Sequence, residues 1–542
     1  MRRGFILLGL AQLIFSACGE AGGALDAGIT PDAGGEAPDA RALDAEPAAD
    51  RASPADAASI EDSGASDAAG PSDAGMLEDA GAVELVSVGG GRELRGVWVA
   101  TVSNIDFPRN NHLSAAQAQA DLATLVTRTA SAGLNAIFFQ VRPESDALYR
   151  SSLEPWSRFL TGTQGQDPGY DPLQTLIDLA RPKHIEIHAW MNPYRGLVSA
   201  SVNAAANHVT RTLSAHAIPY NNGLTMDPAS SEVRMHVVEV VRDLLEHYAI
   251  DGVHFDDYFY PYPDANNTPF PDDASYTAYT QGGGTLSRGD FRRDNVNTLV
   301  REVSALISST KPTVRFGVSP FGIYKNGVPA GIRGLDAYAT IYCDSVLWMQ
   351  QGWVDYLAPQ LYWATTQTAQ AYGTLAPWWA STSTGGRHIF PGHALSRLGS
   401  SAAWDLAEMR AQIEITRGLA DQHAEGDLFF SYHQLDQDLL GIYGLLSTDL
   451  YRAPAIPPAI PRALTAPEPP GLTPVMAGVL IAHPARAGLR GFGLYRQRAG
   501  TWTLERVLPA DAQQAILGPG EAALSAIGLG DVESAGVRVI VP

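Results

Sequence analysis

Residues 231–258, SEVRMHVVEVVRDLLEHYAIDGVHFDDY, contain the alternation that decides the fold. Over 231–247 the apolar residues recur at helical spacing and form one hydrophobic face of an amphipathic helix. Over 252–258 a short run rich in Val, Phe and Tyr predicts a β-strand that contains two adjacent aspartates. A helix followed at once by such a strand is typical of a parallel sheet that is covered by helices.

The same alternation extends through most of the chain on either side of this stretch. It predicts strands at 94–101, 135–142, 186–192, 252–258, 314–320, 356–362, 388–393 and 428–432. The helices predicted between them include 115–132, 231–247, 288–309 and 404–419. Eight such units predict an α/β fold, a (β/α)8 TIM barrel with insertions. A doubly wound open sheet is the alternative, but no Gly-rich phosphate loop follows the first strand.

The N-terminus has the features of an export signal. Two arginines precede an apolar run that is too short to span a bilayer, and Ser16-Ala17-Cys18 then resembles the lipobox of bacterial lipoproteins. We expect a lipoprotein signal peptide at 1–18 and lipidation of Cys18. The exported protein would then be anchored in the cell envelope, with the outer membrane preferred. An ordinary signal peptide with an incidental cysteine is the alternative.

Residues 19–90 are predicted to be a disordered tether. They consist mainly of Ala, Gly, Asp, Pro and Ser and have no hydrophobic period. Between Glu20 and Leu85, 16 acidic residues against two arginines carry 14 of the 21 net negative charges of the 542-residue chain. The remainder is mildly acidic and has no basic patch, so nucleic acid is not an expected partner. The only other cysteine, Cys343, is expected to be a buried apolar residue in a monomeric protein.

The C-terminal part of the chain differs in texture from the barrel. The barrel is predicted to occupy 91–453, and a Pro-rich linker follows at 454–474. Short alternating segments over 475–542 predict a small β-sandwich that resembles a fibronectin type III module. Capping of the barrel is its expected role, and carbohydrate binding is the alternative.

Polar and aromatic side chains gather where the predicted strands end, which is the edge at which barrel enzymes carry their reactive groups. Glycosidic cleavage needs a carboxylic acid and a carboxylate on either side of the scissile bond. Strand alternation turns His254 and Asp256 to one side and Phe255 and Asp257 to the other. We predict Asp256 as the nucleophile or base. The predicted sugar contacts are Asp106, Gln140, Arg142, Trp156, Asn192, Arg195, His254, Tyr258, Gln360, Tyr362 and Trp363.

The general acid is less well defined by the sequence. Asp257 and Asp146 rank first for this role. Each also has a structural alternative. Asp257 can hydrogen-bond the N–H groups of its own loop, and Asp146 can form an ion pair with Arg142 or Arg195.

Five long segments resemble a known family. ELRGVWVATVSNIDFP (93–108), FFQVRPESDALYRSSLEPWSRFLTG (138–162), HAWMNPYR (188–195), DGVHFDDYFYP (251–261) and GWVDYLAPQLYW (352–363) are similar, in order and spacing, to the motifs of the glycosyl hydrolase-like 10 family. The resemblance covers roughly 93–451 and implies an exported bacterial barrel that hydrolyses a glycan. Peptidoglycan strands lacking stem peptides are a known target class of that family. Glu144 departs from the pattern, since the family more often has a neutral residue there.

Two functions of other classes remain open from the sequence. One is a non-catalytic glycan-binding lipoprotein, and the other is a metal-dependent polysaccharide deacetylase that uses His254, Asp256 and Asp257 as ligands. The deacetylase lacks a second histidine pair at ligand spacing, because His184 and His188 flank the start of a strand rather than its end. The glycosidase requires no metal and no cofactor.

Overall fold

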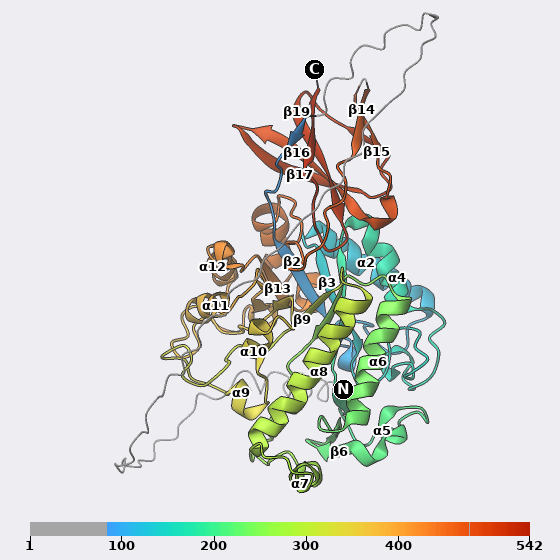
Figure 1. The fold of residues 1–542 in the computed structure, drawn as a ribbon, viewed down its shortest axis with the longest axis vertical. Helices are drawn as coiled ribbons and strands as arrows, with labels where there is room; N and C mark the ends of the chain where they lie inside the picture. The colour runs from blue at the N-terminus through green and yellow to red at the C-terminus, as the bar shows by residue number, and fades with distance from the viewer. Residues whose placement is uncertain (1–83, 476, 542) are drawn as a thin grey trace, which may run out of the picture. The chain divides into compact units, whose positions relative to one another are not determined.

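The structure is a computed structural model, and it describes residues 84–475 and 477–541. The predicted signal peptide, the lipidation site Cys18 and residues 19–83 of the predicted tether lie outside the described residues. Within the described part, a parallel sheet surrounded by helices is followed by a C-terminal module of antiparallel strands (Figure 1). No helix in this part is both long enough and apolar enough to cross a membrane.

The parallel sheet closes into a barrel. Its hydrogen-bonded order is β11-β10-β9-β8-β4-β3-β2-β13-β12, and its strands are β2 (Leu94–Val99), β3 (Ala136–Arg142), β4 (Glu186–Met191), β8 (Gly252–Phe255), β9 (Arg315–Val318), β10 (Tyr356–Leu357), β11 (His388–Ile389), β12 (Gly392–Ala394) and β13 (Gly426–Phe430). The two ends of this order, β11 and β12, are halves of one stretch interrupted at Phe390 and Pro391. The (β/α)8 TIM barrel predicted from the alternation is therefore confirmed, with eight strand positions.

Most of the longer covering helices begin at a polar cap, and α11 with Ala371 at its N-cap is the exception. The longer ones are α2 (Ala115–Ser131), α4 (Pro172–Ala180), α6 (Ser231–His247), α7 (Asp273–Gln281), α8 (Arg288–Thr310), α11 (Tyr372–Ser381) and α12 (Leu406–Arg417). Ser230 caps α6 by accepting a hydrogen bond from Val233 N at 3.2 Å. The apolar face of α6 is buried, as its period predicts. Shorter helices are α3 (Arg158–Thr161), α5 (Val209–Thr212), α9 (Ala337–Thr340), α10 (Ser345–Gln350), α13 (Tyr432–Asp436) and α14 (Ile442–Leu445).

Several strands end earlier than their apolar runs predict. The predicted strand 252–258 ends at Phe255, because the backbone N–H of Tyr258 bonds to the Asp256 carboxylate at 3.2 Å instead of to a neighbouring strand. The predicted strand 356–362 is reduced to Tyr356–Leu357. At the end of β8, a side chain thus forms the hydrogen bond to a backbone N–H that a neighbouring strand would form if β8 were longer.

Large rings fill the barrel interior where glycine leaves room for them. A Cβ at Gly317 would lie 2.1 Å from the Tyr356 ring, and one at Gly252 would lie 2.3 Å from Nδ1 of His188. Both glycines are therefore required by close approach rather than by an unusual backbone conformation. Trp98, Phe138, Trp190 and Tyr356 belong to the same buried cluster inside the sheet.

A small antiparallel sheet is inserted after β4. It comprises β5 (Arg195–Leu197), β6 (Ala217–Tyr220) and β7 (Gly223–Met226), in the order β5-β7-β6. Barrel insertions of this kind follow the carboxyl ends of strands, where they shape the site. This insertion holds Arg195 next to the end of β8, as its contact with Tyr258 shows.

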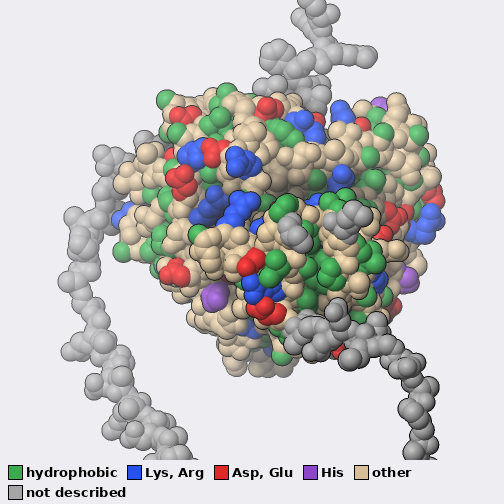
Figure 2. All heavy atoms as spheres, turned by 90° about the horizontal axis from the view of Figure 1, so that it is seen from above, with side chains coloured by type: hydrophobic (Ala, Val, Ile, Leu, Met, Phe, Trp, Pro, Cys, Tyr) green, Lys and Arg blue, Asp and Glu red, His purple; other side chains and the backbone are tan. Residues whose placement is uncertain are grey.

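The C-terminal module consists of two antiparallel sheets. One contains β1 (Leu85–Val86), β20 (Gly536–Val541), β19 (Gly520–Gly528), β16 (Leu489–Arg498) and β17 (Thr501–Pro509), and the other contains β14 (Gly471–Val475), β15 (Gly478–Ala482) and β18 (Gln514–Ile516). The apolar core shared by these strands is consistent with a small sandwich. Figure 2 shows the molecule from the end that carries this module, with Lys and Arg side chains lying among acidic and hydrophobic ones.

Two element positions differ from the predicted boundaries of this module. β1 lies inside the range 19–90 that the sequence assigns to the tether, and it pairs with β20 through Leu85 and Val537. β14 begins at Gly471, inside the range 454–474 that the sequence assigns to the linker. Tertiary pairing orders both segments, although neither carries a strong pattern of its own.

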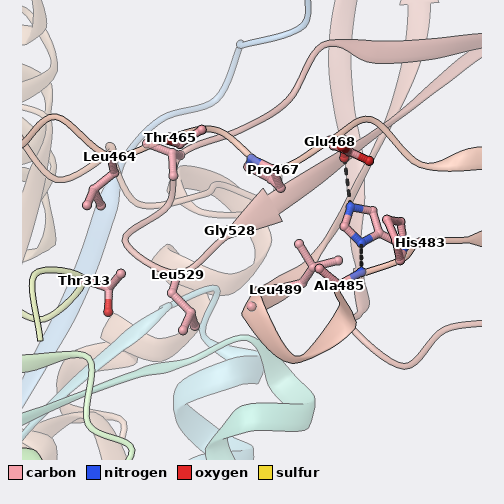
Figure 3. Close-up of a pocket in the computed structure, with 13 residues that line it drawn as sticks. Thr313, Leu464, Thr465, Pro467, Glu468, His483, Ala485, Leu489, Gly528 and Leu529 are labelled. Atoms are coloured by element: carbon pink, nitrogen blue, oxygen red, sulfur yellow. Dashed lines mark hydrogen bonds between the residues drawn. The ribbon is translucent and has the colours of Figure 1, made fainter.

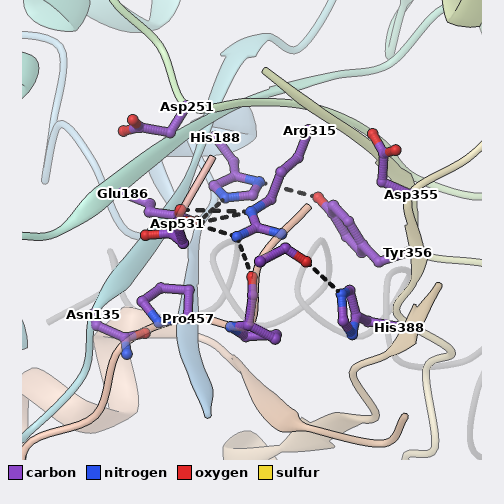
Figure 4. Close-up of polar contacts among 12 residues, drawn as sticks. Asn135, Glu186, His188, Asp251, Arg315, Asp355, Tyr356, His388, Pro457 and Asp531 are labelled. Carbon is purple, nitrogen blue, oxygen red and sulfur yellow. Dashed lines mark hydrogen bonds and ion pairs between the residues drawn. The ribbon is translucent and has the colours of Figure 1, made fainter. Parts of the chain in front are cut away.

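Buried ion pairs join this module to the amino-terminal end of the barrel strands (Figure 4). Asp531 of the module lies 2.6 Å from the Arg315 guanidinium of β9 and 2.9 Å from Arg490. Arg490 in turn lies 2.7 Å from Asp251 and 3.3 Å from Glu186. The module is therefore attached through buried charged side chains whose opposite charges compensate one another.

Candidate active site

Two adjacent aspartates lie at the carboxyl end of β8. Asp256 is 4% exposed, and its carboxylate accepts hydrogen bonds from Trp190 Nε1 at 3.2 Å, from Tyr258 N at 3.2 Å and from Asn192 Nδ2. The carboxylate thus faces β4, which lies next to β8 in the sheet. Phe255 points the other way and packs on Phe316 with ring centres 5.3 Å apart, so the predicted alternation holds as far as Asp256; Asp257 lies beyond the end of the strand.

Asn192 is oriented by a chain of amide hydrogen bonds. Gln140 Nε2 donates to Asn192 Oδ1 at 2.6 Å, and Gln140 Oε1 accepts from the backbone N–H groups of Thr101 and Val102 at 2.8 and 2.9 Å. Since Oδ1 of Asn192 accepts, its Nδ2 group is the one directed at Asp256. Gln140 and Asn192, both predicted as sugar contacts, are fully buried and act here on the carboxylate.

Asp257 is held in a different environment from its neighbour. The Tyr262 hydroxyl donates to its Oδ2, whereas Oδ1 is buried and has no hydrogen-bond partner within bonding geometry among the described residues. Burial and the adjacent Asp256 charge raise the pKa of Asp257 to about 7, against the lowering effect of Tyr262 and Gln360. Asp257 thus retains its proton to a higher pH than an ordinary aspartate does.

The pKa of Asp256 is raised less. Burial brings it to about 6, and the positive charge of Arg195 counters that rise. The two carboxyls therefore differ in proton affinity, which is the condition for one to act as a base or nucleophile and the other as an acid.

Three half-buried side chains lie beside this pair. The Arg195 guanidinium sits 4.4 Å from the centre of the Tyr258 ring, and the Tyr258 and Tyr262 rings are 5.3 Å apart. This arrangement suits a sugar-like ligand with many hydroxyl groups. Its hydroxyls can hydrogen-bond to the guanidinium, and its ring faces can stack on the aromatic side chains.

Asp146 belongs to a second acidic cluster. Its Oδ1 accepts from Glu144 N and its Oδ2 from Gln164 Nε2, both at 3.1 Å. Burial, followed by the Glu144 charge, raises the pKa of Asp146 to about 7. Glu144 itself binds the Arg158 guanidinium at 2.8 Å and Val198 N at 2.7 Å. Asp146 thus anchors its own loop, and the ion pair considered for it with Arg142 or Arg195 is replaced by these bonds.

Arg142 and Asp106 are likewise engaged with protein groups. Arg142 forms a fully buried ion pair with Glu154 at 2.6 Å and donates to the Asn192 carbonyl at 2.7 Å. Asp106 accepts from Ala100 N, from the Ser431 hydroxyl and from His433 N at 2.7 to 2.8 Å. Burial raises the pKa of Asp106 to about 7.

The remaining predicted stacking and polar residues are spread around the barrel mouth. Trp156 is half-buried beside the exposed Arg150, whose guanidinium lies 5.9 Å from its ring. Tyr362 faces Phe430 at 6.1 Å, and Trp363 is buried against Phe321 at 5.6 Å. Gln360 donates from Nε2 to the Ser319 carbonyl at 3.0 Å.

His254 lies deeper, at the top of a hydrogen-bonded column inside the barrel. Trp98 Nε1 donates to Nε2 of His254 at 3.2 Å, so the neutral ring carries its proton on Nδ1 and donates to the Tyr356 hydroxyl at 2.9 Å. Tyr356 then donates to Nδ1 of His188 at 3.1 Å, and Nε2 of His188 donates to Glu186 at 2.9 Å. Burial holds the pKa of His254 well below its usual range, which keeps the ring neutral.

Removing the Tyr356 hydroxyl is expected to destabilise this column. Tyr356→Phe leaves Nδ1 of both histidines buried without a partner, at about 1–3 kcal/mol each. We expect the free energy of unfolding, measured by urea denaturation, to fall by at least about 2 kcal/mol. Tyr372→Phe, which removes a single buried contact with Thr416, is the matched control and should cost about half as much. An equal loss of unfolding free energy in the two variants would contradict the role of Tyr356 as the link between the two histidines in this column.

Sequence reasoning missed several residues of this site. Trp190 and Tyr262 bind the two aspartates, and Tyr356 connects the two histidines, yet none of the three was singled out. Alternation along β4 could have identified Trp190, because it shares a strand face with Asn192. Nothing in the sequence indicates that Tyr262, five residues beyond Asp257, turns back onto it.

A hollow lies beside the C-terminal module, away from the two aspartates (Figure 3). Leu464, Pro467 and Leu489 line it, and at one side of it His483 donates from Nε2 to the Glu468 carbonyl at 2.9 Å. Its lining contains a single carboxylate, that of Glu468. It therefore lacks the pair of carboxyl groups that glycosidic cleavage requires and that Asp256 and Asp257 provide after β8.

The comparison with known proteins agrees with this geometry. The family model of glycosyl hydrolase-like 10 matches residues 93–406, more than half of the chain. The chain belongs to this family. This glycosyl hydrolase-like 10 protein is accordingly a glycosidase, and all the strands of its barrel up to β12 fall within the matched range.

Two relatives and one solved structure illustrate the likeness. Glycosyl hydrolase YngK of Bacillus subtilis (strain 168) is 40% identical over 397 residues, which are 71% of this chain and 77% of that protein. Glycosyl hydrolase DigH of Escherichia coli (strain K12) is 38% identical over 309 residues, which are 53% of this chain and 69% of that protein. The catalytic domain of β-amylase from Paenibacillus polymyxa, at 13% identity and a TM-score of 0.45 over 68% of this chain and 99% of that one, is too distant to inform on function.

Proposed function

We propose that this glycosidase hydrolyses O-glycosidic bonds of a bacterial-envelope or extracellular glycan, with peptidoglycan strands lacking stem peptides as the first substrate class to test. The observation that carries the proposal is the buried Asp256–Asp257 pair at the carboxyl end of β8, in which Trp190 and Asn192 hold one carboxylate and Tyr262 holds the other. The substrate class rests on the family resemblance of the five long motifs.

The two aspartates receive separate roles in this proposal. Asp256, beside Arg195 and oriented by Trp190 and Asn192, acts as the carboxylate, either as nucleophile or as the base that activates water. Asp257, with the higher pKa and with an Oδ1 that has no hydrogen-bond partner among the described residues, donates the proton to the leaving oxygen. The proposal assigns the acid to Asp257 rather than to Asp146, because both oxygens of Asp146 accept hydrogen bonds, from Glu144 N and from Gln164 Nε2.

The cellular location is part of the same proposal. An exported protein anchored through lipid on Cys18, with the outer membrane preferred, would place the barrel within reach of envelope glycans. Residues 19–90 would then act as a spacer between membrane and barrel for most of their length.

The substrate can be identified with the wild-type protein and a panel of polymers. Peptide-free glycan strands, intact sacculi, α-glucans and β-glucans are incubated separately, and the products are read by mass. We expect shorter chains with new reducing ends from the peptide-free strands. If none of these polymers is shortened, although one of them is bound, the hydrolase proposal is wrong and a glycan-binding function replaces it.

The pH dependence of kcat/KM follows from the two pKa values. Asp256 must be ionised, so activity rises as pH increases through about 6, and Asp257 must be protonated, so activity falls as pH increases through about 7. A narrow bell with its maximum between these values is expected. Because the Arg195 charge lowers the pKa of Asp256, Arg195→Gln should move the acidic limb to higher pH.

The exposed Arg150 provides the control for that shift. Arg150→Gln removes a positive charge that lies over Trp156 rather than near Asp256, so the acidic limb should stay where it is in the wild type. An unchanged limb in Arg195→Gln, or a shift of the same size in both variants, would rule out Arg195 as the group that tunes Asp256.

A further inference from the structure

A group of metal-ligand side chains lies at the opposite end of the barrel from the two aspartates. His388 is the first residue of β11, Glu425 directly precedes β13, and His423 ends the short turn before it. One ligand atom from each residue lies within 4.8 Å of the other two. Among residues 84–475 and 477–541, this is the one such group of three.

The hydrogen bonds of His388 leave its Nδ1 atom in an unusual position. Nε2 faces the Ala459 carbonyl at 3.0 Å, and since a carbonyl can only accept, Nε2 carries a proton (Figure 4). In the neutral ring, Nδ1 then has a lone pair and no proton, yet it faces Glu425 Oε2 at 2.9 Å. Two acceptors at this distance require a positive charge between them, which is either a second proton or a metal ion.

The ligand frame is anchored before any ion binds. The Ile389 N–H donates to the His423 carbonyl at 2.9 Å, and the Leu94 N–H donates to the Glu425 carbonyl at 2.9 Å. The His388 ring is stacked parallel to Phe390, with its centre 5.6 Å from that of Phe390. The bond from Nε2 to the Ala459 carbonyl is the outer-shell contact that metal-binding histidines typically make, because it fixes the tautomer that leaves the other nitrogen free to coordinate.

We propose that His388, His423 and Glu425 bind one Zn²⁺ ion. Two imidazoles and a carboxylate are a common zinc ligand set, with water in the fourth position. Ligand atoms on a tetrahedral zinc lie about 3.4 Å apart. Glu425 Oε2 is 2.9 Å from His388 Nδ1 and 3.8 Å from His423 Nδ1, on either side of that separation.

The ion would act as a structural clamp. His423 is 46% exposed, so its ring can turn toward the ion without disturbing the core. The site joins β11, the segment before β13 and, through Ala459, the chain that leads to the C-terminal module. It lies away from Asp256 and Asp257, so the proposal does not depend on the reaction assigned to them.

The test is a zinc titration of the full-length protein, purified without a histidine tag and dialysed against chelator. We expect one Zn²⁺ per chain by calorimetry and by elemental analysis, and a higher melting temperature with zinc than without it. His423→Ala should weaken binding by at least about 100-fold, the upper end of what loss of an outer-shell partner costs. Zinc should then no longer raise its melting temperature.

Two further variants sharpen the result. Glu425→Gln retains a hydrogen-bond partner for His388 but replaces an anionic ligand with a poor one, so it should fold and bind zinc weakly. His247→Ala removes an exposed histidine that lies 3.0 Å from Asp243 outside this group, and it should bind zinc as the wild type does. Absence of stoichiometric zinc in the wild type, or unchanged affinity in His423→Ala and Glu425→Gln, would overturn the proposal and leave a protonated His388 paired with Glu425.

Discussion

Asp256→Asn is expected to lower kcat on the polymer that the protein cleaves by about 10³-fold or more. The substitution removes the negative charge of the carboxylate, which either attacks the sugar as a nucleophile or activates water as a base. It retains one side-chain oxygen that can accept from Trp190 Nε1 and loses the bond from Tyr258 N, so the free energy of unfolding should fall by about 1–3 kcal/mol and the variant should remain folded. The rate of release of reducing ends, together with thermal unfolding of the same preparation, checks both parts of the expectation.

Two aspartates serve as controls for this loss. Asp264 lies in the same loop after β8, but its carboxylate binds Thr268 and Asn266, and Asp264→Asn should keep the wild-type kcat. Asp146→Asn should keep kcat within about 10-fold, since Asp146 anchors a loop instead of donating a proton. A loss in Asp146→Asn as large as in Asp256→Asn would transfer the acid role to Asp146.

Asp531→Ala is expected to lower the free energy of unfolding by about 3–5 kcal/mol. The variant leaves Arg315 and Arg490 buried at the base of the barrel without the carboxylate that lies between them. Glu186 and Asp251 remain nearby but already interact with the same guanidinium groups. Urea denaturation of the purified variant at neutral pH or above measures the loss.

An exposed ion pair provides the comparison. Asp449→Ala removes the partner of Arg410 on the surface, where the side chains are 55% and 36% exposed, and it should cost no more than about 1 kcal/mol. If Asp531→Ala costs as little as Asp449→Ala, the module is held by other contacts and the buried charges contribute little.

The barrel could be predicted because its signals are local and repeated. The face of 231–247 and the run at 252–258 are each readable alone, and their recurrence indicates a closed parallel sheet. The local sequence pattern does not predict the residue at which each strand ends. Tyr258 ends β8 by bonding to the Asp256 side chain, and that contact depends on the folded loop.

The same limit applies to the site. Alternation correctly places Asp256 and His254 on the inner side of β8, but it does not separate a residue at the mouth from one deeper in the barrel. His254 lies below the mouth, where both ring nitrogens contact protein groups. Arg142 also fits a sugar-binding pattern by type, yet it is paired with Glu154, twelve residues along the chain, in a contact that only the tertiary fold creates.

The division of roles between the two aspartates is tested most directly by the dependence of Asp257→Asn on the leaving group. The variant is assayed on the natural polymer and on an aryl glycoside of the same sugar, whose leaving group needs no proton. We predict that kcat/KM falls by about 10²-fold or more on the polymer and stays near the wild-type value on the aryl glycoside, whereas Asp256→Asn loses both, because kcat/KM reports only the cleavage step in which the acid acts. Equal losses of Asp257→Asn on the two substrates, or unimpaired cleavage of the polymer, would contradict the assignment of the acid to Asp257.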